Sequence, residues 1–207
     1  MSKLLYIESS PRKESSASTE VAQSFIDTFK QADASHEVET LNLWEMALPE
    51  FDGERIAAKY SLLHGQMPVD DEARGWEAIT KITEQFKAAD SYLFSIPMWN
   101  FSIPYKLKHF IDLITQPGLT FSFSPETGYQ GMVTGKPVSV IYARGGDYSG
   151  AEVSAMDFQK TYMQMILGFI GFEEINSVVV EPTLADPESR EKTITAAKEL
   201  AVAFANQ

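Results

Sequence analysis

Near its middle the chain reads Ser91-Tyr92-Leu93-Phe94-Ser95-Ile96, followed directly by Pro97-Met98-Trp99-Asn100-Phe101-Ser102-Ile103-Pro104. The first part is an almost unbroken apolar run, which is typical of a strand buried on both faces of a parallel sheet. The two prolines fix φ and push the residues before them toward extended geometry, so the loop between them is stiff. Trp99 and Phe101 can cover a flat ring while Asn100 bonds its polar edge. An ordinary tight turn with buried aromatics is the alternative.

A strand followed by a hydroxyl-rich loop also opens the chain. Residues 4–8 are apolar up to Glu8, the loop after them holds five serines with Arg12 and Lys13, and apolar residues then recur at helical spacing from Val21 to Phe29. We predict a helix over about 17–32. A helix N-terminus presents unpaired N–H groups and a positive dipole end, so this loop favours a phosphate monoester. Simple N-capping is the alternative, but a cap needs one serine.

Strand-like and helical segments alternate along the whole chain. The predicted strands are 4–8, 37–43, 91–96, 138–143 and 175–180, and the predicted helices are 17–32, a region ending with 70–89, 107–114, 158–169 and 194–204. Parallel strands need crossover helices, so this order predicts one α/β domain over 1–207. Its architecture is an open, doubly wound parallel sheet with helices on both faces.

Ligands of such sheets bind outside the carboxyl ends of the strands, at the switch point of the strand order. The serine loop, the loop at 97–104 and the glycine loop that starts at Arg144-Gly145-Gly146 all follow predicted strands and therefore belong to that edge. Residues 116–136 depart from the pattern, and the stretch 120–123 with the turn after it predicts a hairpin. Its phenylalanines indicate burial against the site or a second subunit, unless it is an ordinary surface excursion.

Composition excludes several classes of function. A net charge of −12 with 17 dispersed basic residues argues against nucleic acid and against an anionic membrane surface. The sequence has no cysteine, so it offers no disulfide, thiolate nucleophile or CxxC pair. Since it also shows no signal peptide and no apolar run of 18 residues, we expect a cytoplasmic protein.

Common catalytic motifs are missing as well. The first strand-to-helix turn has no glycine, so a G-x-G-x-x-G dinucleotide fingerprint is unsupported, and no G-x-S-x-G nucleophile elbow occurs. His36, His64 and His109 are far apart and lack the spacing of metal ligands. A monophosphate loop, a rigid aromatic-amide loop and a glycine loop remain, and these three parts suit FMN. Gly145 and Gly146 would let backbone N–H groups approach the pyrimidine edge.

The chain resembles the FMN-dependent NADH-azoreductases, also described as NADH:quinone oxidoreductases. The resemblance runs along nearly the whole sequence and rests on Ser9-Ser10, Ser16-Ala17-Ser18, Pro97-Met98-Trp99-Asn100-Phe101-Ser102-Ile103-Pro104 with Leu107-Lys108, Gly118-Leu119-Thr120-Phe121 and Arg144-Gly145-Gly146. It implies a flavodoxin-like fold with strand order 2-1-3-4-5, and homodimers in which each flavin site is completed by the partner. The FMN-binding residues that it implies are Ser10, Ser16, Ala17 and Ser18 around the phosphate, Met98, Trp99, Asn100 and Phe101 against the ring, and Ala143, Arg144, Gly145 and Gly146 at the pyrimidine side.

We therefore expect an oxidoreductase in which FMN carries two electrons from NADH or NADPH to a quinone or an azo compound by a ping-pong mechanism. The chemistry then belongs to the flavin, no protein side chain is catalytic, and Phe121 is a candidate substrate-pocket residue. A flavodoxin-type electron-transfer protein is the first alternative, and a flavodoxin-fold binding protein without its cofactor is the second. The sequence leaves the choice of nicotinamide, the acceptor and the contacts of Arg12 and Lys13 open.

Overall fold

The protein is described here by a computed structural model of residues 2–67 and 70–207. Five parallel strands form the main sheet in the order β2-β1-β3-β6-β7, which confirms the predicted topology. Their bounds are Lys3–Glu8 (β1), Glu37–Asn42 (β2), Ser91–Pro97 (β3), Val138–Ala143 (β6) and Ile175–Val180 (β7). The three inner strands β1, β3 and β6 are almost entirely buried, as continuous apolar runs require, whereas the edge strand β2 is largely half-exposed.

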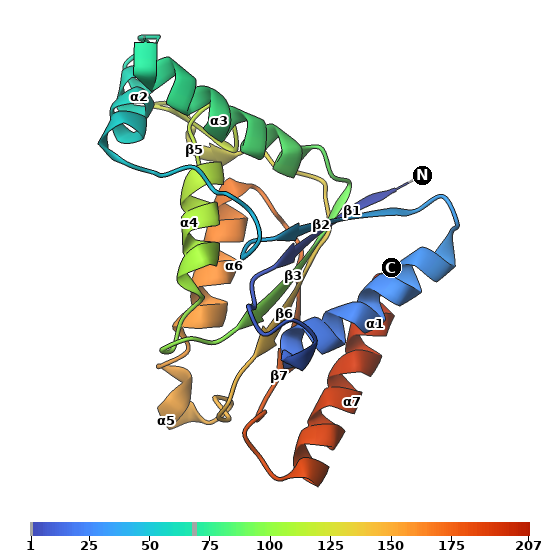
Figure 1. The fold of residues 1–207 in the computed structure, drawn as a ribbon. Coiled ribbons are helices and arrows are strands. Elements are labelled where there is room, and N and C mark those ends of the chain that lie inside the picture. The colour runs from blue at the N-terminus through green and yellow to red at the C-terminus, as the bar shows by residue number, and fades with distance from the viewer. Residues whose placement is uncertain (1, 68–69) are drawn as a thin grey trace.

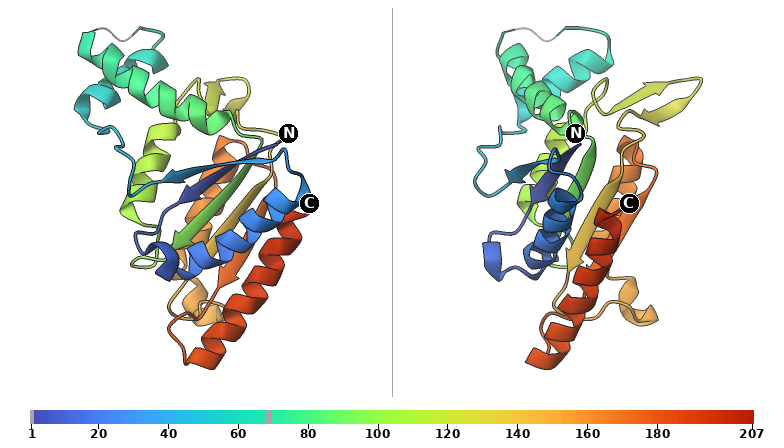
Figure 2. Two further views of the ribbon diagram at one scale, coloured as in Figure 1. Left: turned by 45° about the vertical axis from the view of Figure 1, so that its right-hand side comes forward. Right: turned by 90° about the vertical axis from the view of Figure 1, so that its right-hand side faces the viewer.

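Helices cover both faces of this sheet (Figure 1). The long helices are α1 (Ala17–Ala32), α2 (Gly53–Leu63), α3 (Asp70–Lys87), α4 (Tyr105–Ile114), α6 (Phe158–Ile170) and α7 (Pro187–Ala205), and the short ones are the 3-10 turn at Lys13–Ser15 and α5 (Ala151–Ser154). Helices α1 and α7 lie side by side on one face, and α3, α4 and α6 cover the other (Figures 1 and 2). Among the described residues no helix is long and apolar enough to cross a membrane.

Two apolar cores result, one on each face of the sheet. Alternate residues of one strand enter different cores: Leu4 and Tyr6 pack with α1 and α7, whereas Leu5 and Ile7 pack with α3, α4 and α6. Such burial on both faces is the reason that the inner strands carry no polar alternation.

The excursion after α4 forms the predicted hairpin, with β4 (Phe121–Ser124) antiparallel to β5 (Gly128–Gly131). The hairpin lies at the end of α4 that is remote from the carboxyl ends of the strands (Figure 1). Gly131 packs so closely on the backbone of Gly171 that a Cβ atom at Gly131 would overlap it. The hairpin is therefore fixed against the end of α6.

Helix α7 begins at residue 187, seven residues before Ile194, the first residue that the apolar spacing marks. Asp186 accepts a hydrogen bond from Ser189 N at 3.0 Å and Pro187 occupies the first helical position, so this N-terminus is well specified. The apolar spacing that begins at Ile194 located the buried face of the helix and missed the polar turn before it.

Candidate functional site

A cavity of about 400 Å³ lies at the carboxyl edge of the sheet, where four strand-to-helix connections meet. It is lined by Ser10, Arg12, Ser15, Ser16 and Ala17 from the connection after β1, by Pro97, Met98 and Trp99 after β3, by Ala143 and Gly145 after β6, and by Thr183, Leu184 and Arg190 after β7. We call it the edge cavity. It lies where a doubly wound sheet is expected to bind its ligand.

The serine loop forms the first wall of the edge cavity. Ser10 and Ser16 are 1% and 3% exposed, and Ser18 is completely buried, so these hydroxyls are not surface polar groups. Ser16 occupies the N-cap position of α1, but its Oγ lies 3.1 Å from Ser18 Oγ and accepts no hydrogen bond from the first turn. The N-termini of α2, α6 and α7 are instead capped by Asp52, Asp157 and Asp186.

Ser16 therefore does not act as a side-chain N-cap of α1, which contradicts the simple N-capping alternative for this residue. Because the first-turn N–H groups of a helix have no intrahelical acceptor, an uncapped N-terminus beside a cavity offers donors to an anion. Lys13 is not one of the cations at this wall, since its Nζ is paired with Glu45 at 2.8 Å. Arg12 does line the cavity.

Two hydrogen bonds to neighbouring segments hold the serine loop in place. Ser9 Oγ donates to Ser95 O at 2.6 Å, which ties the end of β1 to β3. Trp44 Nε1 donates to Ser9 O at 2.9 Å from the connection after β2. These two bonds fix the direction in which the chain leaves β1.

The loop after β3 is a tight turn. Trp99 and Ser102 exchange backbone hydrogen bonds of 2.9 and 3.0 Å, and Asn100 and Phe101 between them have φ of 48° and 68°. Positive φ at both central residues is the geometry of a type I′ turn, for which asparagine is well suited. The turn exposes 42% of Phe101, while Trp99 packs against Trp44 with ring centroids 5.5 Å apart.

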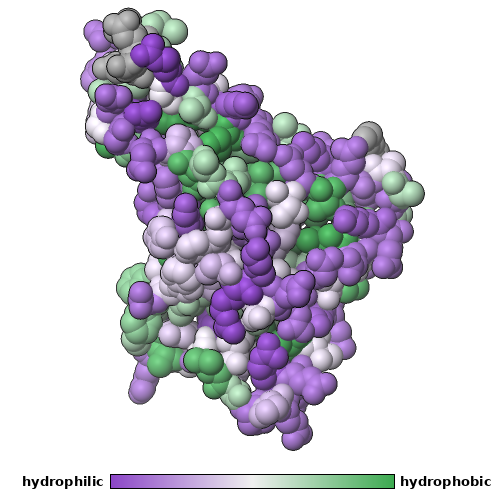
Figure 3. All heavy atoms as spheres, viewed as in Figure 1, coloured by the Kyte–Doolittle hydropathy of each residue, from purple (hydrophilic) through white to green (hydrophobic). Residues whose placement is uncertain are grey.

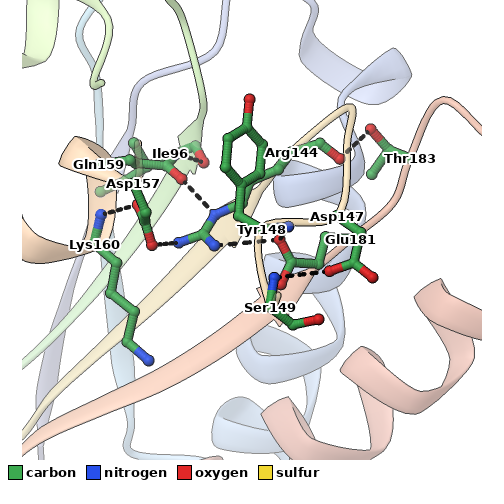
Figure 4. A network of polar contacts seen from close by, with 10 residues as sticks. All are labelled: Ile96, Arg144, Asp147, Tyr148, Ser149, Asp157, Gln159, Lys160, Glu181 and Thr183. Carbon is green, nitrogen blue, oxygen red and sulfur yellow. Dashed lines mark hydrogen bonds and ion pairs between the residues drawn. The ribbon is translucent and has the colours of Figure 1, made fainter. Parts of the chain in front are cut away.

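The glycine loop after β6 is organised by Arg144, whose side chain is only 3% exposed (Figure 4). Its Nη2 pairs with Asp157 at 2.5 Å, its Nη1 with Glu181 at 3.2 Å, and its Nε donates to Gln159 Oε1 at 3.1 Å. The guanidinium is thus directed into the protein and away from the edge cavity. Buried charges are tolerated when they are paired and hydrogen-bonded in this way.

The same network connects three loops of the edge. Gln159 Nε2 donates to Ile96 O at the end of β3, and Glu181 Oε2 accepts from Tyr148 N in the glycine loop. Thr183, after β7, donates from both its N and its Oγ1 to Arg144 O at 2.8 and 2.9 Å. Arg144 therefore fixes the relative positions of the loops that form the cavity walls.

Burial changes the acidity of two side chains beneath the site. It raises the pKa of Tyr6, whose hydroxyl shares a 2.8 Å hydrogen bond with Ser95 Oγ, to about 12. It also raises the pKa of Glu8 at the end of β1, helped by the nearby charge of Glu45. In the exposed glycine loop, hydrogen bonds from Ser149 hold the pKa of Asp147 below its usual range. The neutral Tyr6 is thus a structural group at any physiological pH.

The structure brings together seven of the twelve residues proposed to bind a cofactor. Those that line the edge cavity are Ser10, Ser16, Ala17, Met98, Trp99, Ala143 and Gly145. Ser18 is buried next to Ser16, and Gly146 lies beside the ring of Tyr148. Asn100 lines a larger cavity of about 650 Å³ on the other side of Trp99, together with residues of α4 such as His109.

Phe121 is not part of the edge cavity of its own chain. It is 6% exposed and lines a separate apolar hollow with Lys59, Tyr129 and Phe169 beside the hairpin. No residue lining this hollow also lines the edge cavity.

Sequence reasoning missed the contribution of the connection after β7. Thr183, Leu184 and Arg190 all line the edge cavity. Leu184 packs on Gly145 so closely that a Cβ atom there would lie 2.8 Å from Leu184 Cδ1. The last predicted strand ends at the same edge of the sheet, so the sequence could have predicted that the loop after it contributes to the site.

A doubly wound parallel sheet with a polar cavity at its carboxyl edge, bordered by the N-terminus of a helix, is typical of nucleotide-binding α/β proteins. The family model described as flavodoxin-like fold matches residues 2–204, and the chain belongs to this family.

Two relatives match this chain over all or nearly all of its length. It is 64% identical over 207 residues to a protein of Desulfotalea psychrophila named FMN-dependent NADH:quinone oxidoreductase, covering 100% of this chain and 98% of the relative. A protein of the same name from Nitratidesulfovibrio vulgaris is 45% identical over 210 residues, covering 99% of this chain and 100% of the relative.

Solved structures agree with this relationship. An azoreductase from Bacillus anthracis superposes with a TM-score of 0.91 and 30% identity, covering 100% of this chain and 99% of that one. An FMN-dependent NADH-azoreductase from the same species, solved in complex with FMN, gives a TM-score of 0.86 at 29% identity, covering 99% of this chain and 100% of that one.

Proposed function

We propose that the protein is an FMN-dependent oxidoreductase that transfers two electrons from NADH or NADPH to quinones and reductively cleaves azo compounds. The observation that carries this proposal is the convergence of the serine loop, the turn at residues 99–102 (the tryptophan turn) and the glycine loop on one cavity. The names of the relatives and of the superposing structures support it. The proposal includes a cytoplasmic location, where nicotinamide donors are regenerated.

The residues of the edge cavity fit FMN. The uncapped N-terminus of α1 and the buried hydroxyls of Ser10, Ser16 and Ser18 would hold the phosphate, together with the backbone of Ala17. Met98, Trp99, Asn100 and Phe101 would border the ring system. Ala143, Gly145 and Gly146 would present backbone groups to its pyrimidine side, positioned by the buried side chain of Arg144.

FMN would supply the hydride-accepting and hydride-donating chemistry. The chain would bind it, orient it and block one face with the walls of the cavity. NAD(P)H and the acceptor would then use the remaining face in turn, so we expect parallel double-reciprocal lines. Quinone analogues should compete with NADH for the same reason. Converging lines, which indicate a ternary complex, would exclude the single-face arrangement.

Flavin binding tests the proposal most directly. The purified protein should be yellow, or should bind added FMN much more tightly than riboflavin, because the serine loop favours a phosphate. Anaerobic NADH should bleach the flavin absorbance, and a quinone should restore it. Equal affinity for the two flavins would contradict the phosphate site, and bound FMN without NADH oxidation would favour a flavodoxin-type electron carrier.

The proposal also includes a homodimer formed through the face of α2, α4 and α6. Large hydrophobic side chains are exposed on this side of the molecule, and Figure 3 shows apolar surface over α5 at the lower left. They include Tyr60 and Leu63 of α2, Tyr105 of α4, Phe123 and Tyr129 of the hairpin, Val153 and Met156 of the α5 region, and Phe158 and Met165 of α6. Exposed large hydrophobic side chains that gather on one side of a molecule favour a protein interface. Sedimentation should give a dimer, and a 23.1 kDa species at micromolar concentration would exclude it.

A further inference from the structure

Arg190 is a basic residue that lines the edge cavity and has no role in the flavin site proposed above. It belongs to the first turns of α7, and its side chain is 42% exposed. Because α7 packs alongside α1 (Figure 2), Arg190 reaches the N-terminal part of α1. It lines the edge cavity together with Ser15, Ser16 and Ala17. A guanidinium therefore borders the same end of the cavity as the uncapped helix N-terminus.

Among the described residues Arg190 forms one ion pair, and this pair is long. Its Nη2 lies 3.6 Å from Glu20 Oε2, which is beyond hydrogen-bond distance. Glu20 has a closer cation, because Lys198 Nζ bonds Glu20 Oε1 at 2.8 Å. If Arg190 moved away, the Glu20 carboxylate would keep a partner. The side chain of Arg190 is thus only weakly held by Glu20 and can leave it without stranding the carboxylate.

The other cations near this edge are engaged elsewhere or belong to the serine loop itself. Lys13 is paired with Glu45, and Arg144 is buried between two carboxylates. Arg12 lines the cavity from an exposed turn of the serine loop itself. Arg190 differs from it because a helix carries it to the cavity and a carboxylate of α1 competes for it.

We propose that Arg190 binds the phosphate group of the flavin mononucleotide and exchanges Glu20 for it when the cofactor is bound. This inference rests on the proposed FMN function and adds a residue that selects the phosphorylated flavin. A planar guanidinium presents several N–H donors to phosphate oxygens, and charge-assisted hydrogen bonds of this kind are the strong ones. Glu20 acts as a competitor, so its charge weakens cofactor binding.

The test measures FMN and riboflavin affinity of the full-length protein by flavin fluorescence, and FMN release from the holoenzyme on dilution. Arg190→Gln should weaken FMN about five- to tenfold, which is less than for a buried bond to a charged group because the site is partly exposed, and it should leave riboflavin unchanged. Arg190→Lys should recover part of the loss. Lys192→Gln, which removes a charge from the same helix outside the edge cavity, should change neither affinity.

The competitor gives a second, independent signature. Glu20→Gln should strengthen FMN binding about two- to threefold by freeing Arg190, as expected for removal of a partly exposed ion pair. The same substitution in the Arg190→Gln background should have a clearly smaller effect, because only the direct repulsion between Glu20 and the phosphate is then removed. A purely structural role for Arg190 would instead lower the affinities for FMN and riboflavin equally.

Three outcomes would overturn the inference. The first is an Arg190→Gln protein that keeps wild-type FMN affinity, the second is an equal loss for both flavins, and the third is a Glu20→Gln effect that is just as large without Arg190. In each of these cases a wild-type protein that binds FMN tightly would leave the proposed function intact. A wild-type protein that binds neither flavin would overturn both.

Discussion

The serine loop after β1 and the glycine loop after β6 lie at the same edge of the sheet, but they satisfy their polar groups in opposite ways. In the glycine loop, the guanidinium of Arg144 bonds three acceptors of its own chain, and Glu181 also accepts from Tyr148 N. In the serine loop, the buried hydroxyls of Ser16 and Ser18 bond each other and leave the N-terminus of α1 uncapped.

A region that is satisfied by its own chain contributes to stability, whereas a region with spare donors contributes to ligand binding. Substitutions in the glycine loop network should therefore change the free energy of unfolding first. Substitutions in the serine loop should change cofactor affinity more than stability.

The largest effect is expected for Arg144→Ala. It leaves the side chains of Asp157 and Glu181, which are 13% and 14% exposed, without their cation. Breaking a buried pair by removing one partner costs about 3–5 kcal/mol, so the free energy of unfolding should fall by about that amount. Urea denaturation of the flavin-free protein measures it, with Arg12→Ala as the control in the other loop. A loss below about 1 kcal/mol would show that the network is not a stabilising unit.

Ser16→Ala should act on the other side of this contrast. Removing a donor to a charged phosphate should weaken FMN by about 1.5–3 kcal/mol, which corresponds to roughly ten- to a hundredfold in affinity. Ser16 caps no N–H group of α1, but it bonds the buried hydroxyl of Ser18, so the free energy of unfolding should fall by about 1 kcal/mol, which is less than the loss in FMN binding. Ser24→Ala, farther along α1, is the matched control. Unchanged FMN affinity with reduced stability would assign Ser16 to the helix and not to the cofactor.

This contrast also separates what the sequence predicts from what it does not. The five strands follow from apolar runs such as 91–96, and their order follows from the family resemblance. The serine loop and the tryptophan turn could be placed at one edge because both follow such runs directly. These features are local in sequence, so pattern and spacing are sufficient.

The role of Arg144 could not be predicted in the same way. Its partners Asp157 and Glu181 lie 13 and 37 residues away, and only the packing of α6 and β7 brings them to it. Its position in the glycine loop indicated a cofactor contact, whereas its side chain is directed into the protein. The position of Arg190 at the edge cavity could not be predicted for a related reason. The packing of α7 against α1 decides which cavity this side chain reaches.

Trp44→Phe gives an intermediate effect that tests how the serine loop is held. It removes the Nε1 donor to Ser9 O, a hydrogen bond of 2.9 Å, and keeps most of the aromatic packing against Trp99. We expect a loss of about 1 kcal/mol in the free energy of unfolding and a smaller loss in FMN affinity. Urea denaturation and FMN titration measure the two. If only FMN affinity falls, the bond serves the cofactor site and not the fold.

The smallest effect is expected for Glu8→Gln, at the junction between β1 and the serine loop. Glu8 is 9% exposed, and burial raises its pKa in the folded protein, with Glu45 adding to the rise and Lys13 opposing it. The charged form is therefore penalised by folding, so the penalty is fully present above the folded-state pKa. It disappears as the pH falls below the unfolded value of about 4.3. Glutamine removes the penalty, and the variant should be more stable than wild type at pH 7, with a gain that shrinks as the pH is lowered. Urea denaturation between pH 7 and pH 4 measures this trend, and Glu199→Gln on the exposed side of α7 should show none. A gain that does not change with pH would mean that the substitution acts through packing and not through the charge of Glu8.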